Sequence, residues 1–339
     1  MAGPRKPDIR DVAEAAGVSI ATVSRVLSGR GSTAAATREK VRAVAERLGY
    51  RPDETGRALR TRRTGAVALM LSSVENSFYA TVANEIEQLL TPLGHVTLFG
   101  NTNEDPELQD RFLEEVTARG VSAILMLCAV SSEKIVALAA RQPCILINRR
   151  LPELGDASFV GIDDRLASRQ LADAIHRRGG RRVGLVRGPA YSTTSAARVE
   201  GVTGRLAELG TVVPPESVVE ARLSIASGYQ AAARLLGDDG RGSGAGAGDA
   251  RYDALFCGND QIAYGAHRRC TELGLSVPGD LRIYGFDDNP LNQWLAPWLD
   301  TVRAPPEAFA RETVALLKAL GAGEPHRDVI VPFELVMRS

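Results

Sequence analysis

Residues 20–28 carry short polar side chains and one arginine on one face of a predicted helix. Val23, Val26 and Leu27 recur at i, i+3 and i+4, which predicts that they form the buried stripe. The opposite face and the preceding N-cap position hold Ser19, Ile20, Ala21, Thr22, Ser24 and Arg25. Short side chains let a helix approach base edges closely, and a guanidinium group can donate two hydrogen bonds to one guanine. These six residues are therefore candidate DNA contacts.

A second group of polar residues follows predicted buried strands in the rest of the chain. Amides, carboxylates and guanidinium groups occur in the segments 72–79, 148–149, 163–164, 259–260 and 287–288, and at Arg198. Because the carboxyl ends of parallel strands lie at one edge of a sheet, we expect these segments to converge. Aromatic side chains at 78, 79, 294 and 298 add flat apolar faces. The combination suits a polyhydroxylated ring, although a helix cap or a surface charge would explain any one residue.

Three predicted helices near the N-terminus must position the first group. Asp11 lies in the first turn of a helix with Val12, Ala13 and Ala16 as its apolar face, and Gly17 permits a sharp turn into the second helix. A third amphipathic helix opens over 37–40 and stops at residues 48–52, Leu-Gly-Tyr-Arg-Pro. Helical hairpins without a ligand show the same pattern, so it does not establish DNA binding by itself.

Short apolar strands that alternate with helices must position the second group. The expected strands are 66–71, 96–99, 123–127, 144–147, 160–162, 182–186, 254–257 and 281–286. This alternation predicts parallel sheets, and its two series predict two doubly wound subdomains with a ligand cleft between them. Residues 237–251 are low in complexity and lack a phosphate-loop signature, so we interpret them as a surface insertion of unassigned role.

Charge is distributed unevenly along a chain whose net charge is zero. Residues 1–65 hold 14 Lys and Arg against 7 Asp and Glu, whereas the remainder holds 27 against 34. A small basic segment before a larger acidic one favours contact between the first part and a polyanion. The sequence lacks a long apolar run and a signal-peptide pattern, and its four cysteines lack metal-ligand spacing. We therefore expect a cytoplasmic protein without membrane contact, bound metal or cofactor.

Residues 8–64 resemble the headpiece of the LacI family of bacterial transcription regulators. The resemblance rests on Asp-Val-Ala, Ala-Gly-Val-Ser, Ala-Thr-Val-Ser-Arg-Val-Leu, Thr-Arg-Glu-Lys-Val and Leu-Gly-Tyr-Arg-Pro in this order. It implies an all-α helix-turn-helix headpiece over 1–50, a hinge helix over 51–64, and a two-lobed, periplasmic-binding-protein-like α/β effector domain over 65–339. In the hinge, Arg57 is an expected DNA contact and Leu59 takes the place of the leucine that wedges a base step. Asp53 and Gly56 depart from the usual asparagine and alanine.

The resemblance also covers the second part of the chain and assigns individual positions. It implies effector contacts from Asn76, Phe78, Tyr79, Asn148, Arg149, Arg198, Asn259 and Asp287. Trp294 is a further candidate contact, because Phe78, Tyr79 or Trp294 could supply the stacking that Leu223 does not. Ser77 replaces a proline, Asn148 replaces an aspartate, and Leu223 falls where several members place a stacking aromatic. We expect the N-lobe to comprise about 65–161 and 292–325, and the C-lobe about 162–291 and 326–339.

These expectations combine into a regulator that reads a near-palindromic operator as a homodimer, under the control of a small ligand. The resemblance favours a repressor, with a sugar or sugar derivative as the first candidate effector and a nucleobase-like molecule as the second. A solute-binding receptor shares the two-lobed fold, but it would need an export signal and would not carry residues 8–64. An enzyme is disfavoured because the histidines lack ligand spacing and no nucleophile motif occurs. The sequence leaves open the effector, the operator, the direction of the response, and whether the protein is a dimer or a tetramer.

Overall fold

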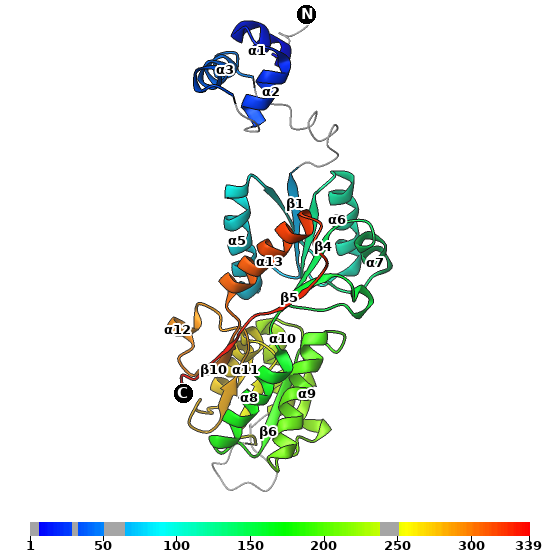
Figure 1. The fold of residues 1–339 in the computed structure, drawn as a ribbon. Helices are drawn as coiled ribbons and strands as arrows, with labels where there is room; N and C mark the ends of the chain where they lie inside the picture. The colour runs from blue at the N-terminus through cyan, green and yellow to red at the C-terminus, as the bar shows by residue number, and fades with distance from the viewer. Residues whose placement is uncertain (1–6, 29–32, 51–64, 238–250) are drawn as a thin grey trace, which may run out of the picture. The chain divides into compact units, whose positions relative to one another are not determined.

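The computed structural model describes residues 7–28, 33–50, 65–237 and 251–339. The chain divides into two compact units, Met1–Thr64 and Gly65–Ser339 (Figure 1). The hinge residues Arg57 and Leu59 and most of the Gly-rich insertion lie outside the described residues, so their predicted roles stay predictions.

The first unit contains the three expected helices, α1 (Ile9–Ala16), α2 (Ile20–Ser28) and α3 (Ala35–Arg47). Asp8 is the N-cap of α1 and forms a capping box with Asp11, the predicted first-turn acid. Gly17 has φ 64°, a left-handed conformation that glycine adopts without strain. α3 begins two residues before the predicted opening at Thr37. The eight fully buried apolar side chains of this unit come from all three helices and form its core.

The second unit contains two six-stranded sheets, one in each lobe. The N-lobe sheet has the order β11 (Asp328–Ile330), β5 (Ser158–Gly161), β4 (Cys144–Ile147), β3 (Ala123–Leu127), β1 (Ala66–Leu71) and β2 (Val96–Asn101). The C-lobe sheet has the order β12 (Glu334–Val336), β10 (Leu299–Arg303), β9 (Arg282–Tyr284), β8 (Ala254–Cys257), β6 (Val183–Arg187) and β7 (Val218–Glu220). All pairings are parallel except that of β10 with β12, which confirms the doubly wound prediction.

Helices follow the strands as the alternation predicted. Those of the N-lobe are α5 (Ser77–Leu90), α6 (Pro106–Ala118), α7 (Glu133–Ala139) and α13 (Pro306–Gly321). Those of the C-lobe are α8 (Asp164–Arg177), α9 (Thr193–Glu208), α10 (Ile225–Leu236), α11 (Asp260–Glu272) and the short α12 (Asn292–Leu295). Short 3₁₀ turns occupy Thr91–Leu93, Pro152–Leu154 and Pro215–Ser217. None of the described helices has the length and apolar content needed to span a membrane.

The expected lobe boundaries need three corrections near the C-terminus. α12 was expected in the N-lobe, but its Asn292 is hydrogen-bonded to Tyr264 and Asp260 of the C-lobe. β10 was expected in the N-lobe, but it pairs with β9 in the C-lobe sheet. β11 was expected in the C-lobe, but it pairs with β5 at the edge of the N-lobe sheet. The intervening α13 packs on α5 in the N-lobe, as expected. The chain therefore crosses between the lobes three times, after β5, after β10 and after β11, and local sequence patterns do not specify where a chain crosses.

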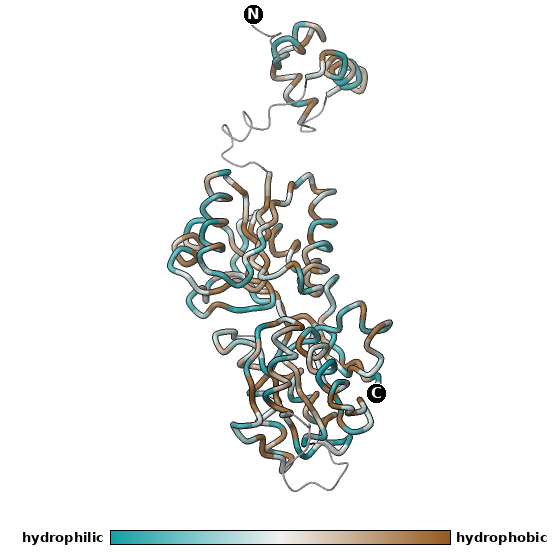
Figure 2. Tube along the Cα trace, turned by 180° about the vertical axis from the view of Figure 1, so that it is seen from behind, coloured by the Kyte–Doolittle hydropathy of each residue, from teal (hydrophilic) through white to brown (hydrophobic). Residues whose placement is uncertain are grey.

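The cores explain why the central strands read as continuous apolar runs. All six residues of β1 and all five of β3 are buried, because helices cover both faces of the sheet. Figure 2 shows these strands in brown, with hydrophilic residues along the outer sides of the helices. By contrast β2, at the sheet edge, leaves Val96 and Phe99 about half exposed, at 56% and 52%.

Candidate functional site

The outward face of α2 is built as the sequence predicts. Ile20, Ala21 and Arg25 are exposed, whereas Val23 and Val26 lie in the core. Ser19 caps the helix, because its Oγ accepts a hydrogen bond from the backbone N–H of Thr22 at 3.1 Å. Thr22 and Ser24 are half-buried at the sides of the face. The helix thus presents small side chains and one guanidinium group on a rigid three-helix base.

A cavity of about 350 Å³ lies between the lobes of the second unit, within the usual range for small-molecule sites. Its lining combines strand-end loops of both lobes: Ser72, Ser73, Glu75, Asn76, Tyr79, Asn103, Glu104, Arg222, Leu223 and Ser224. A second hollow of about 300 Å³ is lined by Asn148, Asp163, Asp164, Thr194 and their neighbours. Of the predicted effector contacts, Asn76 and Tyr79 line the first cavity and Asn148 lines the second. Arg149, Arg198, Asn259 and Asp287 lie at the surrounding strand ends but line neither hollow.

Arg198 is the best-connected of the predicted site residues. It lies on α9, is only 6% exposed, and donates from Nε to Asp164 Oδ1 at 2.7 Å. Its Nη1 donates to the carbonyl oxygen of Gly258 at 2.7 Å, and its Nη2 lies 3.8 Å from Asp287 Oδ1. The guanidinium carbon lies 3.5 Å from the ring centroid of Phe286. These contacts fix a buried planar cation between the start of α8 and the ends of the C-lobe strands β8 and β9.

Two carboxyl groups, those of Asp164 and Asp287, are buried beside Arg198, and both have raised pKa values. Burial raises the pKa of Asp287 to about 8, although Arg198 opposes the shift. Burial also raises the pKa of Asp164, and Arg198 again opposes it. The raised pKa favours the protonated form of the Asp287 carboxyl, which can both donate and accept a hydrogen bond.

Arg149 lies at the N-lobe side of the cleft in a buried ion pair. Its Nη2 donates to Glu104 Oε1 at 2.6 Å, and the two side chains are 2% and 10% exposed. The other carboxylate oxygen of Glu104 accepts a hydrogen bond from the hydroxyl of Tyr191, in the C-lobe, at 3.0 Å. Burial and the nearby Glu104 raise the pKa of Tyr191 to about 12, so this hydroxyl keeps its proton.

The remaining predicted polar residues lie at strand ends around the same cleft. Asn76 caps α5 by accepting from the N–H of Phe78 at 3.1 Å, and its buried Nδ2 has no hydrogen-bond partner among the described residues. Asn259 caps α11 in the same way, with Ile262 as the donor at 3.0 Å. Asn148 donates to the sulfur of Cys128 at 3.2 Å. An unsatisfied buried amide such as that of Asn76 fits a ligand oxygen as its missing partner.

Two predicted aromatic contacts lie elsewhere. Phe78 is 2% exposed and packs edge-on against Phe309 with ring centroids 5.6 Å apart, so it belongs to the N-lobe core and does not line the cavity. Trp294 is 75% exposed on α12 and lines neither hollow. Tyr79, by contrast, lines the cavity, and burial raises the pKa of its hydroxyl well above the usual value.

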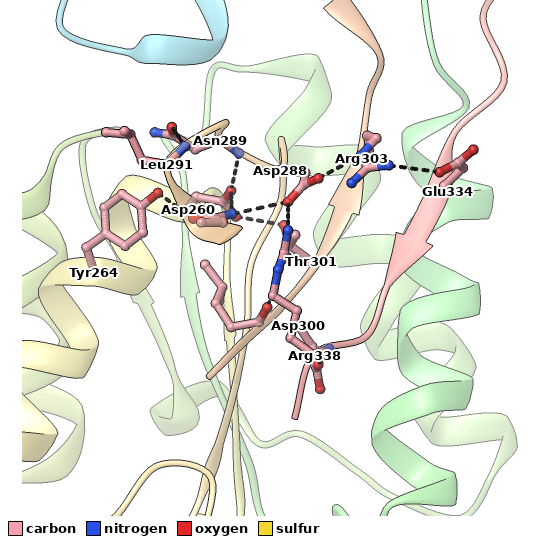
Figure 3. Close-up of polar contacts among 12 residues, drawn as sticks. Asp260, Tyr264, Asp288, Asn289, Leu291, Asp300, Thr301, Arg303, Glu334 and Arg338 are labelled. Atoms are coloured by element: carbon pink, nitrogen blue, oxygen red, sulfur yellow. Dashed lines mark hydrogen bonds and ion pairs between the residues drawn. The ribbon is translucent and has the colours of Figure 1, made fainter. Parts of the chain in front are cut away.

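A polar network fixes the loop that carries Asp287 (Figure 3). Asp260 Oδ2 accepts from the N–H of Asn289 at 2.8 Å and from Asn292 Nδ2 at 2.7 Å, and its Oδ1 accepts from the Thr301 hydroxyl at 2.7 Å. Burial raises the pKa of Asp260 to about 6 despite these donors. The neighbouring Asp288 receives both Arg303 and Arg338. These hydrogen bonds and ion pairs hold the loop in place, with Asp287 Oδ1 3.8 Å from Arg198 Nη2.

Backbone strain is concentrated at the same strand ends. In the described part of the chain, six non-glycine residues have positive φ: Asn103, Glu104, Cys128, Asn148, Asp287 and Asp288. Each follows the carboxyl end of a strand that faces the cleft, namely β2, β3, β4 or β9. Strain of this kind costs about 1–3 kcal/mol per residue and clusters where a ligand is held.

Sequence reasoning missed Glu104, Tyr191 and Arg222 as residues of the cleft. They lie in loops after β2, β6 and β7, and each sits among polar residues of ordinary loop composition. The position of Glu104 after a predicted strand was the signal that could have found it. Among the described residues, no cluster of three or more His, Cys, Asp or Glu side chains could hold a metal ion.

Comparison with known proteins agrees with both units. Residues 8–53 match the family model "Bacterial regulatory proteins, lacI family", and residues 172–339 match "Periplasmic binding protein-like domain". The HTH-type transcriptional regulator MalR of Streptomyces coelicolor is 32% identical, over 97% of this chain and 95% of its own length.

Solved structures show the same architecture. The lac repressor dimer bound to operator and an anti-inducer aligns with a TM-score of 0.83 at 24% identity, covering 98% of each chain. The regulator CelR in complex with cellobiose aligns with a TM-score of 0.69 at 27% identity, covering 98% of this chain and 99% of its own. With its helix-turn-helix unit, its two doubly wound lobes and this similarity along its length, the chain belongs to the lacI family of bacterial regulatory proteins.

Proposed function

We propose that this chain is a repressor that binds operator DNA through α2 and responds to a sugar or sugar derivative bound between its lobes. The observation that supports DNA reading best is the outward face of α2, with Arg25 and Ile20 exposed beside small residues. Arg25 reads a guanine in each half-site, and Ile20 and Ala21 contact thymine methyl groups. Such a protein acts on DNA in the cytoplasm, where metabolite levels set the occupancy of its cleft.

The cleft favours an uncharged, hydroxyl-rich ligand. Arg149 and Arg198 are each already paired with a carboxylate, so neither carries an uncompensated charge toward the cleft. Asn76 and Tyr79 line the cavity and provide polar groups suited to hydroxyl groups, and the Nδ2 of Asn76 lacks a partner among the described residues. Names of relatives point the same way, since CelR was solved with cellobiose. The solute-receptor alternative does not account for the first unit.

A binding selection with random DNA tests the first half of the proposal. The wild-type chain should enrich a near-palindromic site with half-sites about one helical turn apart, and Arg25→Ala should relax one base position per half-site, at a cost of about 1–3 kcal/mol. An unchanged preference in the variant would remove Arg25 as a base reader. A thermal-shift screen of sugars and sugar derivatives tests the second half, because a true effector raises the melting temperature by mass action. In that screen Arg198→Ala should abolish the shift.

The near-palindromic site requires a homodimer, and exposed apolar side chains fit one. Leu291, Trp294 and Leu295 around α12 are 52%, 75% and 72% exposed, and the edge strand β2 exposes Val96 and Phe99. Exposed apolar groups of this size mark contact surfaces. Trp294 is therefore assigned to the subunit interface. Sedimentation should show a dimer that Trp294→Glu weakens; a dimer constant unaffected by this charge would exclude α12 from the interface.

A further inference from the structure

The turn between β2 and α6 directs a carboxylate into the cleft. Asn103 and Glu104 have φ of 51° and 57°, a conformation that costs free energy in non-glycine residues. Asp105 then caps α6 by accepting from the N–H groups of Glu107 and Leu108. The turn is fixed because it lies between the end of β2 and the N-cap of α6. It places the Glu104 side chain, which is 10% exposed, beside Arg149.

Tyr191 meets this carboxylate from the opposite lobe. Its hydroxyl donates to Glu104 Oε2 at 3.0 Å, and its ring centroid lies 5.7 Å from the guanidinium carbon of Arg149. The residue as a whole is 60% exposed, so its ring covers the ion pair at the surface of the molecule. Tyr191, Glu104 and Arg149, called here the latch, thus join the β6–α9 loop of the C-lobe to two N-lobe loops.

Other side chains also donate across the cleft, but to weaker acceptors. Thr193 and Gln261 donate to the carbonyl oxygens of Arg150 and Glu75, at 2.9 and 2.6 Å. Arg222 reaches the carbonyl oxygen of Asn103 at 3.4 Å, and Asn289 donates to the hydroxyl of Ser77. Among the described residues, only the Tyr191 bond crosses between lobes to a charged acceptor. Hydrogen bonds to ionised acceptors are about twice as strong as neutral ones.

We propose that the latch holds the lobes closed in the ligand-free protein, and that Tyr191 is the residue that closes it. The proposal goes beyond DNA binding and ligand response, and its test needs neither operator nor effector. Since Glu104 also lines the cavity, a ligand hydroxyl that reaches Glu104 competes with Tyr191 for the same oxygen. Separation of the lobes and binding of a ligand are then coupled, because both break the hydrogen bond from Tyr191 to the Glu104 carboxylate.

The experiment measures the distance between the lobes in the full-length chain. All four native cysteines are buried, so spin labels attach selectively to introduced cysteines at the exposed positions Glu133 of α7 and Arg234 of α10. Labelled chains are mixed with a large excess of unlabelled chains, so that each dimer carries one labelled pair. Distance distributions by pulsed electron spin resonance are compared for the wild-type background, Tyr191→Phe and Tyr229→Phe.

Tyr229→Phe is the matched control, because its hydroxyl also donates to a carboxylate, Glu272, at 2.6 Å, but within the C-lobe. Tyr191→Phe should lower the ratio of closed to separated lobes about three- to tenfold, while Tyr229→Phe should leave the distribution unchanged. An unchanged Tyr191→Phe distribution, equal shifts in both variants, or a wild-type protein already dominated by separated lobes would each overturn the proposal. A thermal melt confirms that the variants are folded.

Discussion

Replacing Arg198 by methionine tests whether the buried charge cluster is organised as the contacts indicate. Methionine retains the apolar stem over Phe286 but removes the donors to Asp164 and Gly258. Breaking one side of a buried ion pair costs about 3–5 kcal/mol, because the remaining charge stays desolvated. For a unit of this size the melting temperature should fall by about 6–15 °C.

The loss should depend on pH in a defined direction. The pKa of Asp287 in the folded chain, about 8, lies above its unfolded value, so this group favours folding when protonated and loses that contribution as pH rises through about 8. Arg198 holds the pKa values of Asp287 and Asp164 down, and without it both rise further. From about pH 5 to about pH 9, the loss of stability relative to wild type should therefore be greatest above about pH 8, where Asp287 ionises beside Arg198 in the wild type but stays protonated in the variant.

Urea unfolding followed by circular dichroism across this pH range is the assay. Arg205→Met is the control, since Arg205 lies on the same helix and pairs with Asp173 and Glu208 at the protein surface. Solvent screens such pairs, so this variant should differ little from wild type at any pH. A loss for Arg198→Met that is small, or equal at all pH values, would show that Asp164 and Asp287 are not compensated by Arg198.

Substitutions at four further positions test local features. Ser19→Ala should destabilise α2 by about 1 kcal/mol through loss of its cap, seen as faster amide exchange at the start of that helix in the full chain. Gly265→Ala would place a Cβ 2.1 Å from the carbonyl oxygen of Ile225 and should lower the melting temperature sharply, whereas Gly204→Ala, with no atom within 4 Å, should raise stability by about 0.5–1 kcal/mol. Asn76→Ala should cost about 1 kcal/mol and Asn76→Ser less, because serine keeps a capping oxygen for α5; equal melting temperatures would contradict the capping role.

Local patterns predicted the helix-turn-helix unit and eight of the twelve described strands, but not β7, β10, β11 and β12. Helix period, the Gly17 turn and apolar runs are properties of neighbouring residues, so α2 and β1 are where the sequence places them. The prediction of which lobe contains β10 and β11 was wrong. That assignment depends on which sheet each strand pairs with after the chain crosses between the lobes, and this pairing involves residues far apart in the sequence.

The same distinction applies to the residues expected at the effector site, whose roles stay predictions. Arg198, Asp287 and Asn76 could be located from motifs at strand ends, whereas Phe78 shares that motif yet turns into the core beside Phe309. The direction of a side chain at the start of a helix follows from the packing of α13 on α5, more than two hundred residues apart in the chain. Glu104 and Tyr191 form a hydrogen bond because the two lobes lie close together. The pattern of residues along the sequence does not predict this contact between lobes.

The three crossings also govern how the protein can be synthesised. The apolar face of α5, including Val82, Ile86 and Leu90, is complete by residue 90, but its partner α13 begins at Pro306. At about 5–20 residues per second, the ribosome needs about 10–40 s to supply that partner. During this interval the nascent N-lobe lacks both its covering helix and its edge strand β11, so the growing chain depends on chaperones or on provisional packing. Because β11 completes the N-lobe sheet, the N-lobe cannot reach its full native structure until almost the whole chain has been synthesised.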